Sequence, residues 1–158
     1  MLEKLESLSA NQRLALNIFV PLLYFIGLVM AWFAPKYFGF GYRQLVYTGL
    51  SIGLSGLLLW MLSMAHLGDS LKVLPNQSDS QRDVLVMKGV YKYLRHPLYV
   101  GITLTLFGLF LACGSTLGMI YLFVIVVPLN LFRANLEEKA LSEQFGESYR
   151  AYRDKTFF

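Results

Sequence analysis

Residues 98–132 read LYVGITLTLFGLFLACGSTLGMIYLFVIVVPLNLF and contain no Asp, Glu, Lys or Arg. A helix crosses a hydrocarbon core of ~30 Å in about 20 residues, so this stretch of about 35 residues is too long for one pass. Gly114 and Ser115 lie at its middle, and such small residues are typical of a turn. The stretch therefore predicts a helical hairpin of two membrane spans, the first of which begins before Leu98.

Two further uncharged segments, residues 14–34 and 45–65, precede this hairpin, and each is long enough for one span. Pro21 lies in the first, where a membrane helix tolerates a kink. The second carries Gly49, Gly53 and Gly56, a spacing that favours close packing against another helix.

These segments predict an all-α integral membrane protein with four transmembrane helices in a single membrane domain, residues 1–158. We divide it into an N-terminal lead-in with two spans, a loop, the helical hairpin and a C-terminal amphipathic helix. Their ranges are 1–65, 66–97, 98–132 and 133–158. The mixed charges of the lead-in indicate a retained segment and not a signal peptide.

The composition of the chain agrees with this class. Of 158 residues, 56 % are hydrophobic and 15 % are charged, whereas soluble domains are about 25 % charged. The net charge of +4 does not come from a basic stripe, because the basic residues lie between the apolar segments. We therefore expect the lipid bilayer as partner and no nucleic acid.

The basic residues also predict the orientation of the chain. With four spans, two of them precede the first span, five lie between the second and third, and five follow the fourth, so 12 of 14 share one side. The positive-inside rule makes that side cytoplasmic, with both termini there. We expect the plasma (inner) membrane as the location.

The segment at the entry to the third span, residues 89–101, reads GVYKYLRHPLYVG. Pro97 disfavours helix at His96, so the helix should begin directly after it. Its first-turn N–H groups would then be free to bind an anion, beside donors from Arg95, His96 and Tyr99. Alternatively, the segment is an interfacial anchor, since Tyr and Arg favour headgroup depth.

A second polar segment, residues 133–152, reads RANLEEKALSEQFGESYRAY. As a helix it has one apolar face and one solvated face. The apolar face carries Leu141, Phe145, Tyr149 and Tyr152, and the solvated face carries Lys139, Glu143, Glu147 and Arg150. Glu138 falls inside the apolar face and Glu137 on its edge. A buried carboxylate needs a partner, and Arg133 is the nearest one expected. No His, Cys, Asp or Glu cluster has metal-ligand spacing, so we expect no metal.

Together the two segments contain GxYxxxRHPxYxG and, about 35 residues later, EExxLxxxFGxxYxxY. This pair resembles the isoprenylcysteine carboxyl methyltransferase family, within a wider group that includes phospholipid N-methyltransferases. The resemblance implies an S-adenosyl-L-methionine-dependent enzyme with its cofactor pocket on the cytoplasmic side. The implied methyl acceptor is lipophilic or membrane-borne: a lipid, a quinone-like molecule, or a small thiol or amine.

The resemblance also implies roles for individual residues. His96, Tyr99, Arg133 and Glu137 would hold the methionine part of the cofactor. The stretch from Gly89 to Leu98, with Tyr91 and Arg95, would wall its adenosine. Arg133 and Glu138 would form the catalytic centre, Glu138 supporting the site or facing the acceptor.

Two other functions compete with this hypothesis. One is an NADPH-dependent enzyme like the sterol reductases, whose motif lacks the proline found here at Pro97. The other is a non-enzymatic membrane scaffold or transporter subunit. Transport is disfavoured because the predicted spans contain no Asp, Glu, Lys or Arg.

Overall fold

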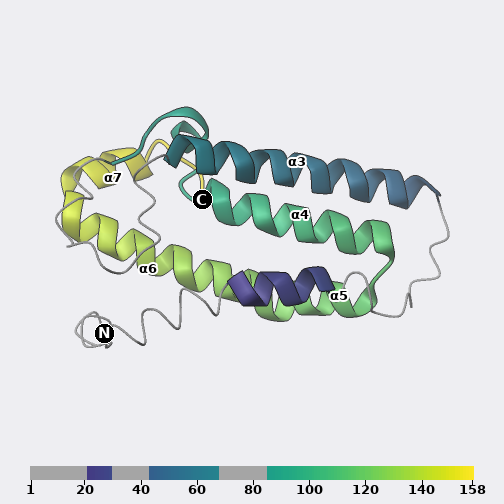
Figure 1. Cartoon of the computed structure of the whole chain (residues 1–158). Helices are drawn as coiled ribbons and strands as arrows, with labels where there is room; N and C mark the ends of the chain where they lie inside the picture. Colours follow the sequence, from purple (N-terminus) through teal and green to yellow (C-terminus); the bar gives the residue numbers. More distant parts are fainter. Residues whose placement is uncertain (1–20, 30–42, 68–84) are drawn as a thin grey trace.

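A computed structural model describes residues 21–29, 43–67 and 85–158 of the chain (Figure 1). Throughout this described part the regular structure is helical, which confirms the predicted all-α class. The N-terminal lead-in and most of the loop that follows the second predicted span lie outside the described residues, as do both ends of the first predicted span. The middle of that span, residues 21–29, is a helix.

In the described part of the chain, seven elements follow residues 21–29. They are α3 (Arg43–Leu67), the 3₁₀-helix η3 (Gly89–Lys92), α4 (Pro97–Cys113), α5 (Thr116–Tyr121), the π-helix η4 (Leu122–Val126), α6 (Val127–Phe145) and α7 (Glu147–Arg153). The elements α5, η4 and α6 form one long helix that runs antiparallel to α4 (Figure 1).

The predicted turn at Gly114-Ser115 is confirmed. α4 ends at Cys113, and Gly114 takes a φ of 63°, a left-handed conformation that glycine adopts without steric cost. Ser115 then caps α5, because its hydroxyl accepts a hydrogen bond of 3.1 Å from the Gly118 N–H. The turn brings the two helices together, and Leu106 and Phe110 of α4 pack against Leu122 and Val126 in the buried core.

The π-helical turn in the long helix has a local cause. Pro128 cannot donate a backbone hydrogen bond, so the ladder of i→i−4 bonds is interrupted there. The wider turn of residues 122–126, which ends with the Val127 N–H donating to the Leu122 carbonyl, directly precedes this interruption.

α3 and α4 pack with their backbones in contact, as the glycine spacing predicted. A Cβ atom added to Gly49 would lie 2.5 Å from the Ala112 backbone nitrogen, and one added to Gly108 would lie 2.2 Å from the Gly53 nitrogen. Only glycine permits this approach, which gives two helices good van der Waals contact where lipid supplies no hydrophobic drive.

Two helices in the described part are long and apolar enough to cross a membrane, Arg43–Leu67 and Thr116–Phe145. α4 is also apolar but has only 17 residues. Large apolar side chains of α3 stay exposed, among them Leu54 at 65 % and Leu58 at 58 %. A continuous apolar surface of this kind is expected where a protein faces lipid.

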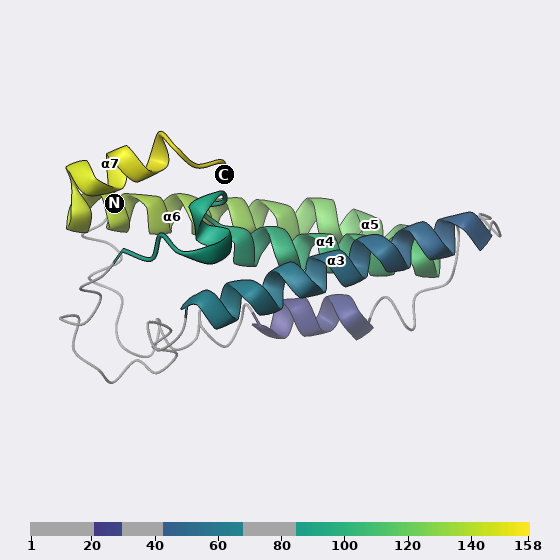
Figure 2. The same cartoon turned by 90° about the horizontal axis from the view of Figure 1, so that it is seen from above.

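The C-terminal region differs from the single helix predicted for residues 133–158. α6 continues without a break from the apolar stretch to Phe145, where Gly146 with a φ of 52° ends it. α7 follows, and the chain then returns to the start of α4 (Figure 2), where Leu94 and Phe157 form a parallel bridge. Four residues lie on the faces predicted for them. Tyr149 and Tyr152 of the apolar face are buried, and Glu143 and Glu147 of the solvated face are exposed.

Candidate active site

His96 lies at the start of α4 with its ring buried. It is the N-cap residue, and Pro97 occupies the first helical position, which confirms the predicted helix start. The residue is 4 % exposed, and its ring stacks on that of Tyr99 at 5.9 Å between centroids. A buried imidazole needs polar partners, and these come from another helix.

Two adjacent carboxylates of α6 flank this imidazole. Glu137 Oε2 lies 3.6 Å from His96 Nδ1, and Glu138 Oε1 lies 3.4 Å from His96 Nε2. The Tyr99 hydroxyl donates a hydrogen bond to Glu137. Successive residues of a helix project about 100° apart, and the two carboxylates accordingly approach different nitrogens of the ring. His96 Nε2 is buried and still makes no aligned hydrogen bond within the described residues.

Arg95 connects this cluster to the C-terminal tail. Its Nε donates to Glu138 Oε1 at 2.7 Å, and its Nη1 donates to the carbonyls of Thr156 at 2.7 Å and Arg153 at 3.2 Å. The partner of the inward carboxylate Glu138 is thus Arg95, 43 residues earlier in the chain, and not Arg133.

The sequence-based pairing of Arg133 is therefore wrong. Arg133 makes no ion pair with any described residue, and its guanidinium lies 5.8 Å from the centre of the Tyr99 ring. Glu137, one turn further along α6, is bound by α4 instead. A half-buried guanidinium over an aromatic face keeps its hydrogen-bond donors available for an anionic group.

The N–H groups at the start of α4 are less free than predicted. The Tyr99 N–H donates to the His96 carbonyl at 3.1 Å in a 3₁₀-type turn. The N–H groups of Arg95 and His96 donate to the Phe158 carbonyl at 2.9 and 3.2 Å. The tail thus binds the two N–H groups that precede the helix, whereas the Tyr99 N–H is used inside the first turn. Of the first-turn N–H groups assigned to a ligand, that of Leu98 remains.

The predicted adenosine wall begins at a tight approach between η3 and α3. Gly89 has a φ of 58°, and a Cβ there would lie 2.2 Å from the ring of His66. The His66 ring covers Gly89, and its Nδ1 lies 2.6 Å from the Leu62 carbonyl.

Tyrosines pack behind this wall. The Tyr152 hydroxyl donates to the Tyr91 carbonyl at 2.7 Å, which fixes η3 against α7. Burial, reinforced by the charge of Glu137, raises the pKa of Tyr91 to about 12. Burial, reinforced by Glu138, likewise raises the pKa of Tyr149 to about 12. Both phenols therefore stay protonated at neutral pH and cannot serve as bases there.

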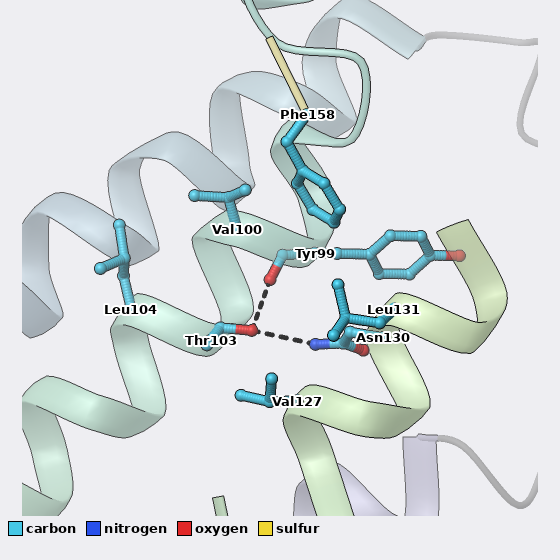
Figure 3. A pocket seen from close by; sticks show the side chains of 8 residues that line it. All are labelled: Tyr99, Val100, Thr103, Leu104, Val127, Asn130, Leu131 and Phe158. Atoms are coloured by element: carbon cyan, nitrogen blue, oxygen red, sulfur yellow. Dashed lines mark hydrogen bonds between the residues drawn. The ribbon is translucent and has the colours of Figure 1, made fainter. Parts of the chain in front are cut away.

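An apolar groove of about 190 Å³ runs between α4 and α6 (Figure 3). Its lining residues are Tyr99, Val100, Thr103, Leu104, Val127, Asn130, Leu131 and Phe158. The Tyr99 side chain extends from α4 towards α6, and the Phe158 ring points towards it from the tail (Figure 3). The groove adjoins the polar cluster through Tyr99, which lines the groove and donates a hydrogen bond to Glu137.

Sequence reasoning missed the polar side chains inside the helical bundle. Asn130 is 3 % exposed; its Nδ2 donates to Thr103 Oγ1 at 3.0 Å, and its Oδ1 accepts from the Tyr24 hydroxyl. This network joins α6, α4 and the helix of residues 21–29. The signal was present, since an amide in an apolar span requires a partner.

A sequence profile of the phospholipid methyltransferase family matches residues 45–148, which contain the whole first motif and most of the second. The chain belongs to this family. The resemblance inferred from the two motifs is thereby confirmed. The family membership and the two helices long enough to cross a bilayer indicate that this chain is a membrane protein.

One relative is the protein-S-isoprenylcysteine O-methyltransferase of Schizosaccharomyces pombe, which is 29 % identical over 93 residues. The match covers 59 % of this chain and 39 % of that protein, so the chain spans well under two thirds of the length of its relative. No solved structure matches the chain significantly.

Proposed function

We propose that this member of the phospholipid methyltransferase family transfers a methyl group from S-adenosyl-L-methionine to a lipophilic acceptor. The observation that carries the proposal is a polar cluster of His96, Glu137 and Glu138, with Arg133 beside it, at the head of an apolar groove. A polar cofactor and an apolar acceptor would meet at this boundary.

The charges of the cluster suit the proposed cofactor. S-adenosyl-L-methionine carries a carboxylate, an ammonium group and a sulfonium. Arg133 would bind the carboxylate, since its guanidinium has no ion pair among the described residues. Glu137 and Tyr99 would face the positive groups, because a carboxylate favours nearby cations. The buried Nε2 of His96 is a further polar atom with capacity for a ligand.

The remaining predicted residues divide into walls and supports. Gly89, Tyr91 and Leu98 would wall the adenosine. We assign Arg95 a positioning role, since its donors are used by Glu138 and by two tail carbonyls. Glu138 would keep Arg95 and His96 in place and stand next to the acceptor.

Methyl transfer requires the protein mainly to orient the cofactor and the acceptor and to exclude water. When bound, the cofactor supplies a methyl group on a positively charged sulfur. Arg133 and Glu137 would fix its orientation, and oriented reactants account for a large part of the rate gain in such displacements. Tyr99 and Phe158 would exclude water from the point of transfer.

We also propose four spans with the site on the cytoplasmic side of the plasma (inner) membrane. The long apolar helices α3 and Thr116–Phe145 support two of these spans. We assign the other two to the shorter apolar helix α4 and to the segment that contains the helix of residues 21–29. The site lies at the end of α4 remote from the Gly114 turn (Figure 1). The basic residues Lys88, Lys92, Lys139, Arg150 and Arg153 belong to that same end, which supports its cytoplasmic placement.

Calorimetric titration of the detergent-solubilised protein with S-adenosylhomocysteine and, separately, with NADPH tests the cofactor. Binding of S-adenosylhomocysteine alone is expected. Binding of NADPH alone would replace the proposal by a reductase, and binding of neither would favour a scaffold. Two acceptors suit a subsequent assay: N-acetyl-S-farnesylcysteine, suggested by the name of the yeast relative, and phosphatidylethanolamine, suggested by the family name.

A further inference from the structure

Phe158 lies where the apolar groove meets the polar cluster. Its ring centroid is 5.5 Å from that of His96, with the ring planes tilted by 57°. The same side chain lines the groove with Tyr99 and Val100, and Figure 3 shows its ring beside the Tyr99 side chain. One aromatic ring therefore touches both parts of the proposed site.

The backbone of this residue is held firmly. The N–H groups of Arg95 and His96 donate to its carbonyl at 2.9 and 3.2 Å, and the Phe157 N–H donates to the Tyr93 carbonyl at 2.9 Å. The Arg95 guanidinium binds two further carbonyls of the same tail. The position of the Phe158 main chain is thus fixed relative to the start of α4.

Its side chain is held much less firmly than its neighbour in the groove. Tyr99 is 6 % exposed and its hydroxyl is bonded to Glu137, so moving its ring would break a charge-assisted hydrogen bond. Phe158 is 41 % exposed and has only ring contacts. Rotation of the Phe158 side chain therefore breaks no polar bond.

We propose that Phe158 is the closing side chain of the groove and sets the width of the group that can pass from the groove to His96 and Glu137. This inference rests on the proposed function, in which the acceptor lies in the groove. A narrow group passes beside the ring, whereas a wide one requires the ring to turn outwards.

The neighbouring Phe157 offers a matched control. It is the same residue type on the same tail, but it is 78 % exposed and does not line the groove. Loss of its ring removes a similar apolar area from the tail without opening the groove.

The test measures how a cysteine in the groove discriminates between a small and a wide reagent. Val100→Cys is placed in a Cys113→Ala background, and its reaction rates with N-ethylmaleimide and N-(1-pyrenyl)maleimide are compared. Adding Phe158→Ala should reduce the rate ratio of small to wide reagent by about tenfold, the factor expected when a steric cost like that of core overpacking is removed. Phe158→Trp should increase the ratio, and Phe157→Ala should leave it within about twofold.

An unchanged ratio in Phe158→Ala, or an equal change in Phe157→Ala, would overturn the proposal. If Phe158→Ala does not fold, a ratio in Phe158→Trp that fails to rise would also overturn it. Binding of S-adenosylhomocysteine to the parent protein is measured in parallel. If the parent protein does not bind S-adenosylhomocysteine, this result counts against the proposed function. The maleimide rate ratios still decide the role of Phe158 in that case.

Discussion

Replacing Glu137 by Gln tests the geometry of the proposed cofactor site. The change keeps the size of the side chain and leaves one oxygen that can accept from the Tyr99 hydroxyl, but it removes the negative charge beside His96 Nδ1 at 3.6 Å. If Glu137 binds the positive groups of the cofactor, one charge-assisted hydrogen bond is lost.

The size of the effect follows from that bond. A hydrogen bond to a charged group contributes about 1.5–3 kcal/mol, and about 1.4 kcal/mol corresponds to a factor of ten in affinity. Glu137→Gln should therefore weaken binding of S-adenosylhomocysteine by roughly tenfold to a hundredfold. Glu147 provides the control: its side chain is 88 % exposed and, among the described residues, forms its ion pair with Arg150 on the same helix. Glu147→Gln should therefore stay within about twofold.

Isothermal titration calorimetry of both variants in detergent gives the two dissociation constants. Thermal melts without ligand must accompany them, because loss of a carboxylate between α4 and α6 could also loosen the bundle. Equal affinity in a folded Glu137→Gln protein and in the wild-type protein would refute the placement of the cofactor beside this carboxylate.

Three further predictions concern the fold and its orientation. Gly108→Ala should lower the melting temperature, since its Cβ would lie 2.2 Å from a backbone nitrogen and overpacking costs about 1–3 kcal/mol; Gly53→Ala, whose nearest atom would be 3.5 Å away, should change it little. Tyr149→Phe should preserve or raise stability because it removes a buried hydroxyl without a hydrogen-bond partner in the described part. Tyr152→Phe should cost about 1 kcal/mol because it removes the hydrogen bond to a backbone carbonyl; equal melts for the two would contradict this. Ser78→Cys should not react with an impermeant thiol reagent added outside intact cells, because we place its loop in the cytoplasm. Labelling from outside would contradict this orientation.

Local signals were sufficient to predict much of this architecture. The turn at Gly114, the start of α4 at Pro97 and the glycine contact of α3 each depend on residue properties that act within one or two helical turns. Helical periodicity likewise placed Glu138 on the inner face, where Arg95 binds it.

The partners of these groups could not be predicted from local signals. The sequence favoured an i→i+4 pair of Arg133 with Glu137, but such a pair is worth only about 0.3–0.5 kcal/mol on an exposed helix. Contacts from α4, made by His96 and Tyr99, replace it. The break at Gly146 then lets the tail return, so that Phe158 reaches the start of α4 from 62 residues away. Only the three-dimensional path of the chain brings these groups together.

Methyl transfer itself is the most direct test of the proposed function. The purified protein is reconstituted in vesicles containing phosphatidylethanolamine, and N-acetyl-S-farnesylcysteine is added in a parallel sample. Both receive S-adenosyl-L-methionine with a radioactive methyl group, and label in the organic phase is counted. We expect enzyme-dependent label in at least one sample. The label should fall sharply in Glu137→Gln and should stay at the wild-type level in Glu147→Gln. Tight binding of S-adenosylhomocysteine without label in either lipophilic acceptor would contradict the proposed acceptor class, and label that persists fully in Glu137→Gln would contradict the proposed site.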